Sequence, residues 1–247
     1  MKIVVDGQAI EAVYGESLLD AAKRAGINIP TLCYHDALKG EGRCRLCMVE
    51  VDQGGRQNLV AACTYPVKDA IEVKTKSPVI DKIRRNIIML LYKRASGSPV
   101  LEKLYHEYGC GENSLTENPE ERCILCNLCV KACEEVGANA ISLILRGTEK
   151  RVAAPYDQAA ATCIGCGTCA RVCPTGAIEM VEEGNRRVIW HKSFELQACC
   201  HCGKYYATKE EIDYLADKHR EFDYPEKLCE DCRKRDAAMK IKRFNTN

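Results

Sequence analysis

Cysteine is the residue type that dominates the chemistry available to this sequence. The chain contains 18 cysteines among 247 residues, far above an ordinary intracellular protein and just under the range of disulfide scaffolds. Cys110 stands alone, and the others form four groups. The groups are Cys33, Cys44, Cys47 and Cys63; Cys123, Cys126, Cys129 and Cys133; Cys163, Cys166, Cys169 and Cys173; and Cys199, Cys200, Cys202, Cys229 and Cys232. Patterned thiolates bind metals or redox cofactors, so metal centres are expected to organise much of the chain.

The rest of the composition favours reduced thiols over disulfides. The N-terminal residues 1–7 turn polar after three apolar positions, so we expect no signal peptide and no secretory context. The longest apolar-looking stretch, residues 79–91, is interrupted by charged side chains and cannot span a bilayer. A formal net charge of +1 leaves no electrostatic footprint for nucleic acid. We therefore expect a soluble, cytoplasmic protein with no membrane span and no nucleic-acid partner.

The strongest signal is the motif C-x2-C-x2-C-x3-C, which occurs twice, starting at Cys123 and at Cys163. This spacing resembles that of bacterial dicluster ferredoxins, in which the fourth cysteine of each run ligates the other cluster. The resemblance implies two [4Fe-4S] clusters with crossed ligands. One would be held by Cys123, Cys126, Cys129 and Cys173, and the other by Cys163, Cys166, Cys169 and Cys133. Two zinc sites are the alternative, although this repeated spacing has almost no other use.

The N-terminal group has an unequal spacing, Cys33-x10-Cys44-x2-Cys47-x15-Cys63. Two glycines in the first gap, at positions 40 and 42, allow the backbone to bend closely around a cofactor. Four thiolates, three of them in one glycine-bearing loop, suit a [2Fe-2S] cluster. Zinc is the alternative, but zinc loops rarely combine so unequal a spacing with strands.

The segment around this group predicts a small, mostly β unit. Asp6-Gly7 is a favoured two-residue hairpin turn. Ser17 can cap a helix over residues 18–24, and Gly26 supplies a left-handed stop. Strands are expected over residues 2–5, 8–13, 45–51 and 71–74. Strand, strand, helix and strands is the order of a β-grasp fold.

Residues 77–95 predict one amphipathic connecting helix, capped by Ser77 with Pro78 in the first turn. An apolar stripe faces the next domain, and Arg84 and Arg85 are expected to lie away from it. The stripe consists of Val79, Ile80, Ile83, Ile87, Leu90 and Leu91. The helix therefore connects two metal-binding domains and carries no ligand itself.

The C-terminal group predicts a further metal site of a different kind. Cys199-x2-Cys202 and Cys229-x2-Cys232 are two C-x2-C knuckles with 26 residues between them, which fits a tetrahedral, structural zinc ribbon. A helix is expected over residues 208–220 in the insert. The rival is a further iron–sulfur cluster, because Cys200 and His201 are spare potential ligands.

Residues 1 to about 180 resemble a known family of electron-transfer subunits. The runs around Cys33, Cys44–Val51 and Cys63 resemble the [2Fe-2S] domain of the large iron–sulfur subunit of complex I and of the diaphorase iron–sulfur subunit of NAD-linked hydrogenases. Complex I relatives then carry a His-x3-Cys-x2-Cys-x5-Cys loop with an extra [4Fe-4S] cluster. His106-x3-Cys110 imitates only its opening, so we expect a solvent-facing histidine and a buried thiol there.

The expected fold is α+β, with four parts: a [2Fe-2S] β-grasp domain over residues 1–76, a helical connector over 77–118, a dicluster [4Fe-4S] ferredoxin domain over 119–182 and a zinc-ribbon-like tail over 183–247. The sequence has no Gly-x-Gly-x-x-Gly after a strand, no Walker sequence and no nucleophile elbow. We therefore expect no catalytic residue and no substrate site in this chain.

The resemblance implies a subunit that relays single electrons between a flavoprotein NADH-type subunit and a hydrogenase or formate dehydrogenase catalytic subunit. A related use is in an electron-bifurcating complex that also exchanges electrons with ferredoxin. The expected cofactors are one [2Fe-2S] cluster, two [4Fe-4S] clusters and one Zn. The alternative function is that of a free-standing polyferredoxin electron carrier.

Overall fold

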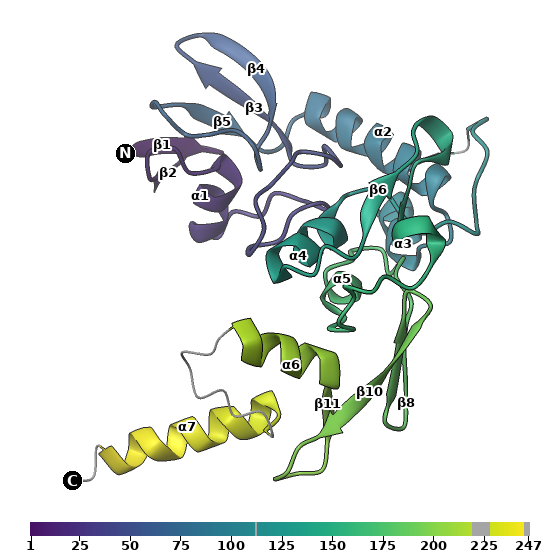
Figure 1. Cartoon of the computed structure of the whole chain (residues 1–247). Coiled ribbons are helices and arrows are strands. Elements are labelled where there is room, and N and C mark those ends of the chain that lie inside the picture. The colour runs from purple at the N-terminus through teal and green to yellow at the C-terminus, as the bar shows by residue number, and fades with distance from the viewer. Residues whose placement is uncertain (112, 219–227, 245–247) are drawn as a thin grey trace. The chain divides into compact units, whose positions relative to one another are not determined.

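The computed structural model describes residues 1–111, 113–218 and 228–244 (Figure 1). The chain forms two compact units, one of residues 1–132 and 172–177, the other of residues 133–171 and 178–247. The short segment that contains Cys173 therefore belongs to the first unit, whereas the residues on either side of it in the sequence belong to the second. None of the described helices combines the length and the apolar character that crossing a bilayer requires.

The N-terminal part of the first unit is a five-stranded mixed sheet with one helix. In the sheet order β2-β1-β5-β3-β4, β1 and β5 are parallel and the other neighbours are antiparallel. The elements are β1 (Lys2–Val5), β2 (Gln8–Glu11), α1 (Leu18–Arg24), β3 (Met48–Gln53), β4 (Arg56–Ala61) and β5 (Glu72–Lys74). Buried side chains of α1 and the sheet, among them Val5, Leu18 and Val49, form one core. Figure 1 shows α1 beside this sheet.

Local residue choice explains the first elements. Asp6 and Gly7 both have positive φ, as the favoured hairpin turn requires, and β1 is confirmed over its expected range. The Ser17 hydroxyl accepts a hydrogen bond from the Asp20 backbone N–H and caps α1 as expected. β2 is shorter than expected and ends at Glu11.

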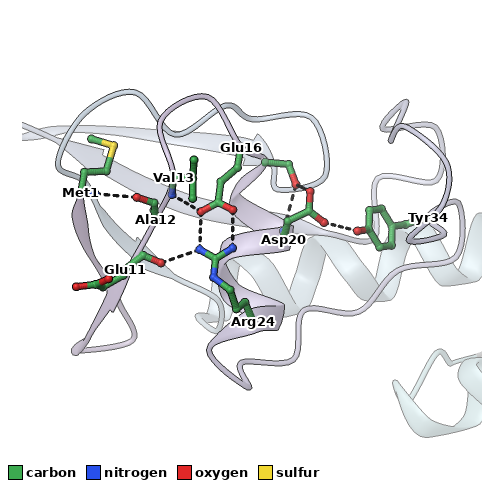
Figure 2. A network of polar contacts seen from close by, with 9 residues as sticks. Met1, Glu11, Ala12, Val13, Glu16, Asp20, Arg24 and Tyr34 are labelled. Atoms are coloured by element: carbon green, nitrogen blue, oxygen red, sulfur yellow. Dashed lines mark hydrogen bonds and ion pairs between the residues drawn. The ribbon is translucent and has the colours of Figure 1, made fainter. Parts of the chain in front are cut away.

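A network of polar contacts joins the segment before α1 to side chains of that helix (Figure 2). The Arg24 guanidinium pairs with both carboxylate oxygens of Glu16 at 2.7 Å and donates to the Glu11 carbonyl at 2.9 Å. The hydrogen bond from Arg24 lowers the pKa of the Glu16 carboxyl. Earlier in the same helix, Asp20 accepts a hydrogen bond from the Tyr34 hydroxyl. This network ties α1 to the loop that carries the first cysteines.

One further strand prediction was displaced, and one strand was missed. β3 covers Met48–Gln53, later than the expected residues 45–51, and β4 was missed. The signal for the missed hairpin is Gly54-Gly55, two residues with positive φ between β3 and β4. Cys63 follows the end of β4, so the missed hairpin brings Cys63 to the loop of Cys33, Cys44 and Cys47.

The connector consists of two helices, α2 (Pro78–Arg94) and α3 (Pro99–Glu107). Ser77 caps α2 as expected, accepting from the Ile80 backbone N–H at 3.2 Å. The predicted stripe is confirmed only in part. Ile80 is buried and Ile83, Ile87 and Leu91 are half-buried, but Val79 and Leu90 are exposed, and Arg84, which was expected to face away, is 4% exposed. The Arg84 guanidinium finds backbone carbonyl acceptors in the protein interior, and burying it without such partners would be costly.

The second unit contains a sheet that the sequence did not lead us to expect. It has the order β11-β10-β9-β8, with all neighbours antiparallel, and a separate pair joins β6 and β7. The strands are β6 (Ser142–Ile144), β7 (Arg151–Ala153), β8 (Met180–Glu183), β9 (Arg186–Ile189), β10 (Lys192–Ala198) and β11 (Tyr205–Thr208). Short 3-10 turns cover Gly147–Glu149 and Pro155–Asp157.

The remaining helices are α4 (Leu128–Val136), α5 (Thr168–Arg171), α6 (Lys209–Lys218) and α7 (Glu230–Phe244). Three of them, α4, α5 and α7, contain cysteines of the motifs. Thr208 caps α6 by accepting from the Glu211 backbone N–H at 3.1 Å. The helix expected over residues 208–220 is therefore present as far as residue 218, and residues 219–220 lie outside the described residues.

Candidate metal centres

The four N-terminal cysteines, Cys33, Cys44, Cys47 and Cys63, are all buried and lie together. Cys47 Sγ is 3.4 Å from Cys63 Sγ, and the Cys44 backbone N–H donates to Cys33 Sγ at 3.3 Å. The hydrogen bond between the Cys47 and Cys63 sulfur atoms lowers the pKa of Cys47 to about 7, which favours the thiolate that binds metals. A Cβ at Gly40 would lie 2.6 Å from the Cys63 carbonyl oxygen, so this close approach requires glycine.

The Arg84 side chain of α2 donates two hydrogen bonds to the backbone next to Cys47. Its Nε donates to the Leu46 carbonyl at 3.2 Å and its Nη2 to the Met48 carbonyl at 3.0 Å. Both carbonyls flank Cys47, so the guanidinium fixes the backbone on either side of a candidate ligand. Sequence reasoning missed this residue because a charged side chain at helical spacing usually faces solvent.

The first predicted set of the dicluster region lies in the first unit. Cys129 is buried, and Cys123, Cys126 and Cys173 are half-buried. The Ala177 backbone N–H donates to Cys173 Sγ at 3.2 Å, and the Leu125 backbone N–H donates to Cys123 Sγ at 3.4 Å. Burial raises the pKa of Cys126 to about 11, and the charges of nearby Cys173, Cys123 and Cys33 act in the same direction. Cys173 therefore lies near the cysteines of the first motif.

The second predicted set lies in the second unit. Its four cysteines line one cavity together with apolar side chains, including Ile141, Ile164 and Ile189. The cysteines are Cys133, Cys163, Cys166 and Cys169. The Ala140 backbone N–H donates to Cys133 Sγ at 3.2 Å. Because four cysteines line one apolar cavity, the residues present fit a thiolate-ligated [4Fe-4S] cluster.

The two cysteine loops differ at equivalent positions. Leu125 and Asn127 of the first loop have positive φ, and Gly165 and Gly167 have positive φ at the matching places in the second. A Cβ at Gly165 would lie 2.6 Å from the Phe194 ring, and one at Gly167 would lie 2.5 Å from Met180 Sδ. The second loop therefore needs glycine, because β8 and β10 pack directly against its backbone.

Side chains of that sheet donate hydrogen bonds to the second loop. Arg187 Nη1 donates to the Gly165 carbonyl at 2.7 Å, Lys192 Nζ to the Cys163 carbonyl at 2.8 Å, and the Thr208 hydroxyl to the Ile164 carbonyl. The Trp190 indole N–H donates to Cys169 Sγ at 3.4 Å. Burial raises the pKa of Cys169 to about 11, and the indole N–H opposes this by favouring the thiolate.

The tail brings together the four cysteines predicted for it. The Sγ atoms of Cys199, Cys202, Cys229 and Cys232 all lie within 4.8 Å of one another, which fits a tetrahedral metal site. The Cys229 backbone N–H is the largest of several influences that lower the pKa of Cys199 to about 6. The spare candidates Cys200 and His201 are exposed and lie outside this set.

The imitation motif His106-x3-Cys110 does not form a ligand set. His106 at the end of α3 is exposed, and Cys110 is half-buried with its thiol donating to the Arg85 carbonyl at 3.4 Å. Among the described residues, the only group of three or more metal-ligating side chains that meets within one ion's reach is the tail set. His106 and Cys110 are therefore accounted for by local structure.

Two family models match this chain over its cysteine motifs. Residues 1–78 match a 2Fe-2S iron-sulfur cluster binding domain, and residues 118–180 match a 4Fe-4S dicluster domain. The chain thus contains one region that matches each of these two cluster-binding domains.

The sequence relatives belong to NAD(P)-linked oxidoreductases. The chain is 31% identical over 230 residues to an NADH-quinone oxidoreductase subunit of Rhizobium meliloti, covering 82% of this chain and 27% of the relative. It is 33% identical to the NADPH-Fe(3+) oxidoreductase subunit alpha of Geobacter sulfurreducens, covering 72% of this chain and 24% of the relative. The chain spans about a quarter of the length of these two proteins.

Hydrogenases give matches of the same strength. The chain is 32% identical to the NADP-reducing hydrogenase subunit HndD of Solidesulfovibrio fructosivorans, over 72% of this chain and 36% of that subunit. A chain in the crystal structure of an NAD+-reducing [NiFe]-hydrogenase in the H2-reduced state aligns with a TM-score of 0.60 and 29% identity, covering 71% of this chain and 85% of the other. The predicted resemblance to iron–sulfur subunits of complex I and NAD-linked hydrogenases is confirmed.

Proposed function

We propose that this chain holds one [2Fe-2S] and two [4Fe-4S] clusters and relays single electrons between a flavoprotein NAD(P)H subunit and a hydrogenase or formate dehydrogenase subunit. Iron–sulfur clusters supply one-electron transfer, whereas splitting the electron pair of NADH requires a flavin in a partner. We further propose that this chain itself carries out no reaction on a substrate. We also propose that the protein is located in the cytoplasm.

The packing between two cysteine loops of the first unit is the observation that carries this proposal. Cys33 and Cys44 belong to one apolar cluster that also contains Ile124, with Cys126 packed against it. Such contact between the [2Fe-2S] loop and the first [4Fe-4S] loop suits direct electron exchange between their cofactors. A chain that merely stored iron or sensed oxygen would not need its clusters in packing contact.

The ligand sets follow from which cysteines lie near one another. We assign Cys33, Cys44, Cys47 and Cys63 to the [2Fe-2S] cluster. We assign the two [4Fe-4S] clusters to Cys123, Cys126, Cys129 and Cys173, and to Cys163, Cys166, Cys169 and Cys133. The grouping of residues 172–177 with the first unit and of Cys133 with the second supports the crossed arrangement. We also propose that the chain divides into domains at residues 1–76, 77–118, 119–182 and 183–247.

The tail cysteines Cys199, Cys202, Cys229 and Cys232 are proposed to bind structural zinc, because four converging thiolates leave no open coordination position. A fourth iron–sulfur cluster is the competing occupant. We also propose that the N-terminal sheet with α1 is a β-grasp fold and that the tail is a zinc ribbon. Their support is the sheet order β2-β1-β5-β3-β4 with α1, and the two paired C-x2-C knuckles.

Metal and sulfide analysis of anaerobically purified protein, with EPR during stepwise reduction, tests the cofactor content. We expect about ten iron, about ten acid-labile sulfides and about one zinc per chain. About fourteen iron without zinc would make the tail a fourth redox centre, and fewer than about six iron would refute the relay.

The partners are tested by isolating the tagged chain from its native cells without oxygen. We expect a flavoprotein and a hydrogenase or formate dehydrogenase subunit to copurify, and NAD(P)H to reduce the clusters only when the flavoprotein is present. Ferredoxin-dependent reduction of the complex would identify an electron-bifurcating assembly. A stable monomer that exchanges electrons with many proteins would instead support the free-standing polyferredoxin.

A further inference from the structure

The β9–β10 hairpin contacts the second cysteine loop through two side chains that lie outside the C-x2-C-x2-C-x3-C motif. Trp190 lies in the turn and Lys192 is the first residue of β10. The matched dicluster domain ends at residue 180, so this turn lies beyond it. We propose that Trp190 and Lys192 raise the reduction potential of the second [4Fe-4S] cluster above that of the first. This inference rests on the proposed function, because it requires both clusters to be present.

Trp190 acts directly on a candidate ligand. Its indole N–H lies 3.4 Å from the Sγ of Cys169, which is buried at the start of α5. A hydrogen bond to a cluster sulfur withdraws electron density and stabilises the extra negative charge of the reduced cluster. The tryptophan is therefore a positioning and tuning residue that leaves the ligand set unchanged.

Lys192 adds a positive charge to the same loop. Its Nζ donates to the Cys163 carbonyl at 2.8 Å and lies 4.8 Å from the centre of the Phe194 ring. Across the described ranges, no carboxylate forms an ion pair with Lys192, whereas Arg187 of the same sheet is paired with Glu182 at 2.7 Å. The positive charge of Lys192 favours the reduced cluster.

The backbone of the turn is held in an unfavourable conformation that this placement explains. Trp190 and His191 are the two central residues of the β9–β10 hairpin and both have positive φ, at 51° and 61°. Asparagine and glycine are the favoured residues there, and a bulky side chain in this region is an outlier. Such strain concentrates where a side chain has a function to perform.

The first cluster site has a different electrostatic neighbour. Its Cys126 packs against the apolar cluster that contains Cys33, a proposed ligand of the [2Fe-2S] cluster. An anionic neighbour disfavours the addition of an electron, whereas Lys192 and the Trp190 N–H favour it at the second site. The two sites are therefore expected to differ in potential despite their identical motifs.

An EPR-monitored redox titration of the full, cluster-loaded chain tests this inference with the variant Trp190→Phe, which keeps an aromatic ring and removes the N–H. We expect the higher of the two [4Fe-4S] midpoints to fall by about a tenfold change in the ratio of oxidised to reduced cluster, or about 59 mV for one electron. The other midpoint and the iron content should stay the same.

Tyr205→Phe is the matched control, because Tyr205 is an exposed ring on β11 of the same sheet. Lys192→Met, which keeps the apolar stem, should lower the same midpoint, and it decides the question by the same criterion if Trp190→Phe loses iron. An unchanged midpoint, or a fall confined to the lower one, overturns the inference. A wild-type chain without two [4Fe-4S] signals refutes the proposed function instead.

Discussion

The buried guanidinium of Arg84 donates a hydrogen bond to the carbonyl oxygen of Leu46 across 3.2 Å. The same group donates to the Met48 carbonyl at 3.0 Å. A helix that sequence patterning treats as a plain connector therefore fixes the backbone on both sides of Cys47. This contact gives the first prediction.

Arg84→Leu should destabilise the [2Fe-2S] site more than any other. The variant leaves two buried carbonyls without donors, at a cost of about 1–3 kcal/mol each. We expect faster loss of the [2Fe-2S] EPR signal in urea, with the [4Fe-4S] signals lost later. Arg85→Leu is the control, because exposed Arg85 donates to the Tyr108 carbonyl and, among the described residues, to no carbonyl of the first cysteine loop. Equal sensitivity of the two variants would show that the contact does not support the site.

Replacing Cys173 by Ser tests the crossed arrangement of ligands. Because Cys173 lies near Cys123 and Cys126, we expect the cluster of the first motif to be damaged, with loss of up to about four iron. Cys133→Ser should damage the cluster of the second motif, since the charge of Cys133 acts on Cys163 and Cys169.

Selective isotope labelling or EPR spectra of the two variants show which of the two [4Fe-4S] clusters is damaged in each. Exposed Cys200 provides the control, and Cys200→Ser should keep every signal. If Cys173→Ser harms only the cluster of Cys163, the ligands are not crossed.

Cys229→Ser should release the tail metal and leave the redox signals intact. Cys229 is buried among the other tail cysteines, so the loss removes one of four converging thiolates. We expect about one zinc to be lost and the segment after β11 to become sensitive to limited proteolysis, while the three EPR signals persist. Disappearance of an EPR signal would instead identify the tail as a fourth cluster.

Trp190 should report the assembly of the second cluster by fluorescence. It is the only tryptophan of the chain, and its N–H contacts Cys169 Sγ. Iron–sulfur clusters absorb broadly and accept excitation energy from a nearby indole, so reconstitution of the apoprotein should quench the emission severalfold. Zinc added alone should leave it bright. Emission that stays constant while iron is incorporated would place the cluster elsewhere.

Much of the cofactor chemistry could be predicted from the sequence. The C-x2-C-x2-C-x3-C repeat and the unequal N-terminal spacing identify the two cluster-binding domains that the family models match. Spacing is informative here because thiolate ligands on a short loop must surround a cluster of fixed size, and few spacings allow it. The Asp6-Gly7 hairpin and the Ser17 cap could also be predicted, because each depends on residues that are close by in the chain.

The rest required the tertiary structure. Arg84 is buried because carbonyls from β3 and its preceding loop accept its hydrogen bonds, and these partners lie 36 and 38 residues away. Trp190 meets Cys169 because a strained turn and a sheet of four strands carry it there from 21 residues away. The sequence by itself determined which atoms could bind metal, because ligand chemistry is local. Only the fold decided which side chains surround those ligands, because such contacts join segments whose separation no local pattern records.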